Sequence, residues 1–149
     1  MDLFDISFFL STFWVGPFWV AMLFYPNHEL TQKWMDTPWF FLGPILIWWA
    51  IMVSNPLSLV EFGLDSMDPE NVLSGLADLL STRAGASAAW AHFVARDIVV
   101  TRWIWKRCLD MDASGPARFA SIFFGVMLMP VGVVLHLLLV RGPHKDKSQ

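Results

Sequence analysis

The chain has little of what a soluble enzyme site is built from. Its single cysteine, Cys108, excludes an internal disulfide and any zinc cluster built on thiolates. Its ten Lys and Arg residues, set against thirteen Asp and Glu, form no basic stripe, so we expect no nucleic-acid partner. The sequence also lacks a nucleophile elbow, a phosphate loop, a His-x-x-x-His motif and a Cys-x-x-Cys motif. Hydrolysis of a soluble substrate is therefore unsupported.

Apolar residues are what the chain has in excess. Hydrophobic residues make up 56% of it, nine residues are Trp, and the mean hydropathy is +0.51. A soluble domain averages roughly 45–50% apolar residues, so a water-soluble fold would leave part of this excess exposed. Asp2 and Asp5 precede the first apolar run, where a secretory signal would be positively charged. We therefore expect an integral membrane protein that keeps this first segment as an anchor.

Apolar stretches long enough to cross a hydrocarbon layer of about 30 Å predict an all-α, polytopic fold. We expect one domain over residues 1–149 with four transmembrane helices, at about residues 6–25, 37–54, 85–105 and 119–140. In the acidic loop between the second and third spans, Pro69-Glu70 is followed by leucines at helical spacing, which predicts a short amphipathic helix near the interface. The polar stretch 26–33 is predicted as a loop and the segment 141–149 as a solvated tail.

Prolines interrupt three of the predicted spans, at Pro17, Pro44 and Pro130. A proline removes one helical hydrogen bond, and in lipid the freed carbonyl needs a partner from a neighbouring helix or a cavity. The prolines therefore predict either simple kinks or a widened central cavity.

The third predicted span carries Arg96, Asp97 and Arg102, each of which costs about 2.5–3.5 kcal/mol at the centre of a bilayer. At 100° per residue, Trp90, Asp97 and Thr101 share one strip of this helix, and the other half carries Ala88, Ala91, Ala95 and Ile98. We expect the polar face to point into the bundle. Asp97 and Arg96 then form either an internal salt bridge that ties helices together or part of a functional site.

Partners for the polar groups of this helix must come from elsewhere, because His92 and Asp97 lie about 140° apart around its axis. The candidates are Arg102 on the same helix, His136 on the last span, and Asn27, His28 and Glu29 at the end of the first. Trp14, Trp19 and Trp90 are candidates to line a site for an elongated apolar ligand. Most other Trp residues are expected at the membrane interfaces.

Three motifs carry a resemblance that extends over nearly the whole chain. They are Tyr25-Pro26-Asn27-His28-Glu29-Leu30-Thr31, Ala89-Trp90-Ala91-His92 followed by Asp97 and Arg102, and Pro130-Val131-Gly132 followed by His136. Together they resemble the plant and bacterial neoxanthin-synthase-like family, the "abscisic acid deficient four" proteins. The chain departs from the family pattern at Arg96, where an apolar residue is expected, and in its long acidic loop.

This resemblance implies a membrane protein of carotenoid metabolism, since plant members of the family are needed to convert the epoxide violaxanthin into the allenic neoxanthin. The implied chemistry is an isomerisation that requires no metal or soluble cofactor, with Asp97 as the acid and neutral His92 as the base. Trp90, Asn27, Glu29, Arg102, His136, Trp14 and Trp19 would then contact the substrate or pigment.

Two other classes of function remain open from the sequence. The chain could be a small subunit that binds a carotenoid or chlorophyll within a photosynthetic complex, with His92 or His136 as the ligand of a pigment magnesium. It could also be a structural assembly factor without a ligand. In each case we expect membrane lipid as a partner and a location in a bacterial inner membrane or a photosynthetic membrane.

Overall fold

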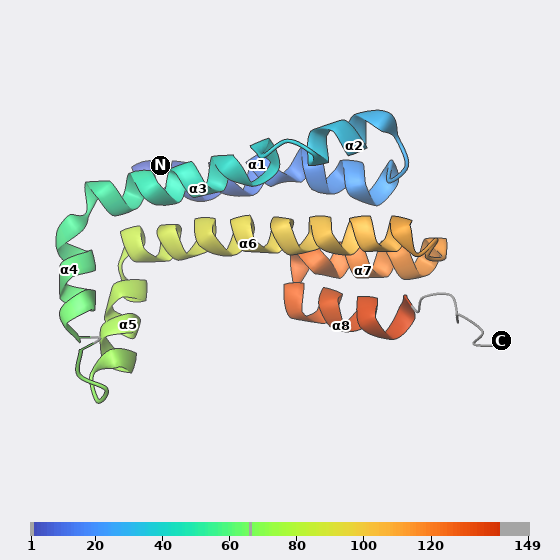
Figure 1. The fold of residues 1–149 in the computed structure, drawn as a ribbon. Coiled ribbons are helices and arrows are strands. Elements are labelled where there is room, and N and C mark those ends of the chain that lie inside the picture. The colour runs from blue at the N-terminus through green and yellow to red at the C-terminus, as the bar shows by residue number, and fades with distance from the viewer. Residues whose placement is uncertain (1, 66, 141–149) are drawn as a thin grey trace. The chain divides into compact units, whose positions relative to one another are not determined.

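The computed structural model describes residues 2–65 and 67–140, and this part of the chain is helical without a strand. The helices are α1 (Leu3–Phe24), α2 (Glu29–Met35), α3 (Trp39–Ser54), α4 (Pro56–Asp65), α5 (Val72–Ser81), α6 (Arg83–Asp110), α7 (Gly115–Met127) and α8 (Met129–Leu139), as Figure 1 shows. The all-α prediction is therefore confirmed. The predicted solvated tail lies outside the described residues.

Two stretches of the described chain are long and apolar enough to cross a membrane. They are α1 and the segment Glu29–Ser54, which comprises α2 and α3. The sequence predicted four spans. By length and composition, the structure supports a membrane protein, but it supports only two of those four spans. The third predicted span lies within α6, which is long enough but carries Arg96, Asp97 and Arg102.

The prediction of a single helix over residues 119–140 is wrong. This segment consists of α7 and α8, which meet at Leu128 with φ −150° and ψ 80°. Pro130 lies in the first turn of α8, where its missing N–H costs nothing and its fixed φ suits a helix start. The proline therefore begins a new helix instead of kinking a long one.

The loops predicted from polar residues also contain helices. Part of the stretch 26–33 forms α2, whose N-cap is His28, with its Nδ1 accepting a hydrogen bond from the Leu30 N–H at 3.2 Å. The acidic loop holds α4, which the sequence did not predict, and α5, where the amphipathic helix was predicted. α4 and α5 pack side by side.

The chain divides into two compact units. The first comprises residues 1–15 and 41–95, and the second comprises residues 16–40 and 96–149. The core of the first unit gathers around Ile51, Met52 and Ala88, and Phe4, Ile47, Trp48 and Ala84 pack against it. That the two units form the single domain expected from the sequence stays a prediction.

In the second unit, α7 and α8 pack against each other at Gly125 and Gly132. A Cβ at Gly132 would overlap the backbone of Gly125 and lie 2.8 Å from the carbonyl carbon of Phe124. Glycine is therefore required for the two helices to approach this closely. A Cβ at Gly125 would meet the hydroxyl oxygen of Thr101, on α6, at 2.8 Å.

Candidate functional site

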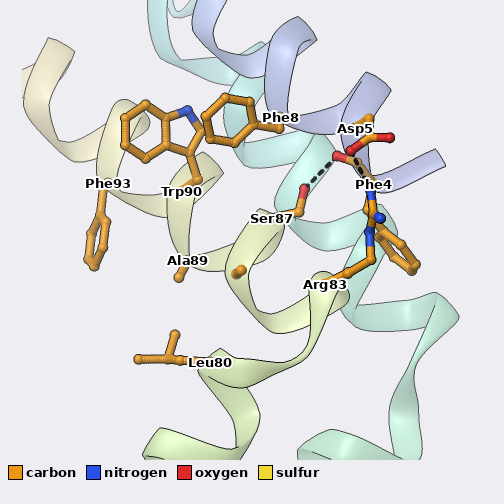
Figure 2. A pocket seen from close by; sticks show the side chains of 10 residues that line it. Phe4, Asp5, Phe8, Leu80, Arg83, Ser87, Ala89, Trp90 and Phe93 are labelled. Atoms are coloured by element: carbon orange, nitrogen blue, oxygen red, sulfur yellow. Dashed lines mark hydrogen bonds and ion pairs between the residues drawn. The ribbon is translucent and has the colours of Figure 1, made fainter. Parts of the chain in front are cut away.

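A pocket in the first unit lies against α1 and α6 and has a volume of about 460 Å³. It is lined by Phe4, Asp5, Phe8, Leu80, Arg83, Ala86, Ser87, Ala89, Trp90 and Phe93, nine of which Figure 2 labels. Its volume falls in the range of roughly 300–1,000 Å³ that small-molecule sites occupy. The lining is mostly aromatic and aliphatic, with polar groups confined to a few positions.

The aromatic wall of the pocket is held in place by a hydrogen bond. The indole Nε1 of Trp90 donates to the hydroxyl oxygen of Thr12 at 2.8 Å, which fixes the indole against α1. The ring of Phe8 stacks on that indole with centroids 4.8 Å apart and planes 27° apart. These rings lie side by side in Figure 2. Their flat faces suit contact with a planar, conjugated or ring-shaped apolar ligand.

The polar edge of the pocket is an ion cluster that joins the first turn of α1 to the first turn of α6. The guanidinium of Arg83 pairs with both Asp2, at 3.1 Å, and Asp5. Asp2 also caps α1, because its Oδ1 accepts the N–H groups of Phe4 and Asp5 at 3.0 Å. Close by, the hydroxyl of Ser87 donates to the carbonyl oxygen of Phe4 at 3.2 Å. With two carboxylates around one guanidinium, this edge has no spare positive charge for an anionic head group.

The two residues predicted as base and acid do not line this pocket. His92 is exposed, with its ring centroid 6.3 Å from that of Trp48, and it belongs to the first unit. Asp97 belongs to the second unit, where its Oδ1 lies 3.5 Å from Nε of Arg96. Because Arg96 is the adjacent residue of α6, this ion pair does not tie two helices together. The expectation of an inter-helical salt bridge is thus wrong for this pair.

The prediction that the polar face of this helix points inward is also wrong for much of its length. The buried face carries Ala88, Ala91, Ala95 and Ile98, together with Thr101. Trp90 is 36% exposed, and His92 and Arg96 are exposed as well. Small side chains allow neighbouring helices to approach closely, and this packing gain decides which face of α6 is covered.

The first motif of the family pattern forms the turn between α1 and α2. Side chains of α6 bond to the backbone just before α2 and at its last residue. The indole of Trp105 donates to the carbonyl oxygen of Pro26 at 3.1 Å. Arg102 donates from Nε to the carbonyl oxygen of Met35 at 2.5 Å and lies 3.5 Å from the carboxylate of Asp36. Arg102, predicted to contact a ligand, is therefore engaged with the last turn of α2.

Asn27 and Glu29, also predicted as ligand contacts, are exposed on this turn. A second pocket of about 240 Å³ lies beside them, lined by Ala21, Tyr25, His28, Leu30, Thr31 and Trp34. Neither Asn27 nor Glu29 lines it.

The remaining predicted residues pack within their own units. Trp14 covers Gly43 so closely that a Cβ there would overlap the indole. Trp19 donates from Nε1 to the carbonyl oxygen of Ile122 at 3.4 Å. His136 is 2% exposed, its Nδ1 lies 3.5 Å from the Cys108 sulfur, and its ring meets Trp103 edge-on at 5.2 Å. Of the predicted ligand contacts, only Trp90 lines the aromatic pocket.

Sequence reasoning missed Phe8, Thr12, Asp5, Arg83 and Ser87. The signal for the ion cluster was available: acidic residues begin the first helical run, and Arg83 lies just before the predicted third span. Opposite charges at the starts of two helices pair only if those starts meet, which the sequence does not reveal. In the described ranges 2–65 and 67–140, no group of three His, Cys, Asp or Glu residues lies close enough to hold a metal ion.

Comparison with known proteins gives two findings. The family model described as ABA DEFICIENT 4-like matches residues 6–136. The Arabidopsis thaliana protein named "Protein ABA DEFICIENT 4, chloroplastic" is 28% identical over 134 residues, which is 88% of this chain and 59% of that protein. The chain thus spans less than two thirds of that relative's length. No solved structure matches the chain. The relative's name places that protein in the chloroplast and gives no support to the bacterial inner membrane, one of the two locations expected from the sequence.

Proposed function

Because the chain belongs to the ABA DEFICIENT 4-like family, we propose that it is an integral membrane protein of carotenoid metabolism that binds one end of a carotenoid in the aromatic pocket. The observation that carries this proposal is the stacked Phe8 and Trp90 pair, held by Thr12 in a pocket of about 460 Å³. A pocket of this size holds an end group and part of the adjoining polyene, and the rest of an elongated molecule extends into lipid.

The charge of the pocket edge supports a neutral ligand over a charged lipid. Arg83 is already paired with Asp2 and Asp5, so an anionic head group would meet two carboxylates around one guanidinium. An apolar end group with a hydroxyl or epoxide would instead place its oxygen atom at this edge and its carbon skeleton against the aromatic rings. Carotenoids with oxygenated end groups have this chemistry.

The finer proposal is that the protein isomerises an epoxide-bearing carotenoid. An acid protonates the epoxide oxygen, the adjacent C–O bond breaks, and a base removes a proton from the polyene, so that an alcohol and a new C=C bond form. One proton is added and one is removed, and the product has the composition of the substrate. Asp97 as acid and His92 as base rest on the resemblance alone, because neither lines the pocket.

A non-enzymatic pigment-binding protein is the second candidate, and the same geometry favours it. The carboxylate that does line the pocket, Asp5, is paired with Arg83 and accepts the N–H of Asp2 at 3.0 Å, so it is poorly placed to give up a proton. A site that only binds needs shape and apolar contact, which the described pocket has.

The test is to express the chain in a host that makes epoxide carotenoids, purify it in mild detergent, and measure the bound pigment. Trp90→Leu and Phe8→Leu should each weaken binding about two- to tenfold, since a stacked aromatic contact contributes about 0.5–1.5 kcal/mol. Phe13→Leu is the matched control, because Phe13 is an exposed ring of α1 that does not line the pocket. Equal pigment loss in all three variants would contradict the proposed site.

The same preparation separates the two candidate functions. An isomerase converts added epoxide carotenoid to a product of equal mass, and Asp97→Asn should keep the pigment while conversion falls about 10²–10⁴-fold. Stoichiometric pigment that stays unchanged on incubation would favour the binding protein and remove Asp97 and His92 from the site.

A further inference from the structure

α7 and α8 form a tight antiparallel hairpin. Figure 1 shows α8 running back along α7, and the close approach of Gly125 and Gly132 brings residues seven apart in the sequence into contact. Such residues would lie about 10 Å apart along one continuous helix. The chain therefore reverses its direction at Leu128.

Neither helix of this hairpin is long enough to cross a membrane. α7 has 13 residues and α8 has 11, which at 1.5 Å per residue gives lengths of about 20 Å and 17 Å. The hydrocarbon layer is about 30 Å thick. Each helix can therefore reach from one interface to about the middle of the layer.

The outer surface of the hairpin suits hydrocarbon. No Asp, Glu, Lys or Arg occurs between Arg118 and Arg141. Met127 and Leu128, at the tip, are more than half exposed. The exposed side chains of α8 before its last residue are also apolar, and they include Val131, Val134, Leu137 and Leu138. On this outer surface, the polar Ser114 and the charged Arg118 lie at the opposite end of the hairpin.

The backbone of Leu128, at the tip, is hydrogen-bonded, which matters in lipid because an unpaired N–H or C=O group there costs several kcal/mol. The N–H of Leu128 donates to Phe124, and the carbonyl oxygen of Leu128 accepts from Val131 at 2.9 Å and Gly132 at 3.1 Å. Pro130 has no N–H to satisfy. Both backbone polar groups of Leu128, the residue at which the chain reverses, thus have partners.

The inner surface holds the polar side chains of the hairpin. His136 contacts Cys108, and the hydroxyl of Ser121 donates to the carbonyl oxygen of Ala117 at 2.7 Å. Both residues are buried, so this surface faces protein and the apolar one faces outward.

We infer that the α7–α8 hairpin is re-entrant: it enters the membrane tip first, contacts the lipid hydrocarbon of one leaflet, and returns Val140 to the side of the membrane on which the turn at residues 111–114 lies. The inference rests on the proposed membrane location and is otherwise independent of the ligand. It gives the chain one crossing fewer than a four-helix arrangement.

The test maps the side of the membrane on which single cysteines react. In a Cys108→Ser background, where a hydroxyl replaces the thiol beside His136, we would introduce Ser114→Cys, Leu128→Cys and Leu139→Cys one at a time. Sealed right-side-out and inverted membrane vesicles are then treated with a membrane-impermeant maleimide, before and after detergent. A parallel carbonate wash shows whether each variant stays in the membrane.

We expect the cysteines at positions 114 and 139 to react in the same type of vesicle and the cysteine at position 128 to react only after detergent. Reaction of positions 114 and 139 in opposite vesicle types would overturn the hairpin and restore a crossing helix. Reaction of position 128 without detergent would show that the hairpin lies on the surface, which also overturns the inference. Release of the wild-type chain by carbonate would instead overturn the membrane location on which the proposed function depends.

Discussion

The contact between Gly125 and Gly132 predicts a specific sensitivity to one methyl group. In Gly132→Ala the new Cβ would lie 2.5 Å from the Cα of Gly125 and 2.8 Å from the carbonyl carbon of Phe124. Ordinary carbon contacts are about 3.5–4.0 Å, so α7 and α8 must separate by about 1 Å. Backbone atoms cannot rotate away as a side chain can, which places the cost in the upper half of the usual 1–3 kcal/mol for overpacking.

The same substitution also stabilises α8 by up to about 1 kcal/mol, because alanine is a better helix former than glycine. The net effect expected for Gly132→Ala is a loss of about 1–2 kcal/mol of unfolding free energy. Gly63→Ala is the matched control: Gly63 lies within α4 with nothing within 4 Å of its added Cβ, so this variant should be neutral or slightly more stable. Gly125→Ala should fall between the two, since its Cβ meets the side chain of Thr101, which can move.

The assay is reversible unfolding of the detergent-solubilised protein by increasing denaturing detergent, followed by Trp fluorescence. The order of stability should be Gly63→Ala, wild type, Gly125→Ala, Gly132→Ala, from highest to lowest. A Gly132→Ala protein as stable as Gly63→Ala would mean that α7 and α8 do not touch through these glycines, and the hairpin geometry would be refuted.

Two further predictions concern contacts of α6. Arg102→Met should remove the charged donor from the Met35 carbonyl, at a cost of about 1.5–3 kcal/mol. Hydrogen exchange should then accelerate in α2 while exchange in the rest of the chain is unchanged. Uniform acceleration would contradict this local role of Arg102. Trp90→Phe and Thr12→Val should each destabilise by about 0.5–1.5 kcal/mol, and the double variant should cost little more than either alone because both remove one hydrogen bond. Additive losses in this double-mutant cycle would show that the two side chains do not interact.

The sequence alone determined the features that depend on local composition. Uncharged, apolar runs of helical length located α1 and α3, and leucines at helical spacing located α5. Short motifs identified the family, because the order and spacing of residues such as Trp90, His92 and Asp97 can be recognised without any coordinates. The sequence also predicted Trp90 as a ligand contact, and of the predicted site residues it is the one that lines the aromatic pocket.

The tertiary structure alone decided what depends on contacts between distant residues. Hydropathy cannot distinguish one 22-residue helix from two shorter ones, because Pro130 is compatible with both a kink and a helix start. Only the packing of Gly132 on Gly125 shows the reversal. Likewise, the alanines and the polar residues of α6 formed two faces of similar width, and close helix packing selected the alanine face for burial. Phe8 and Arg83 joined the site for the same reason, since their partners lie 82 and 78 positions away along the chain, at Trp90 and Asp5.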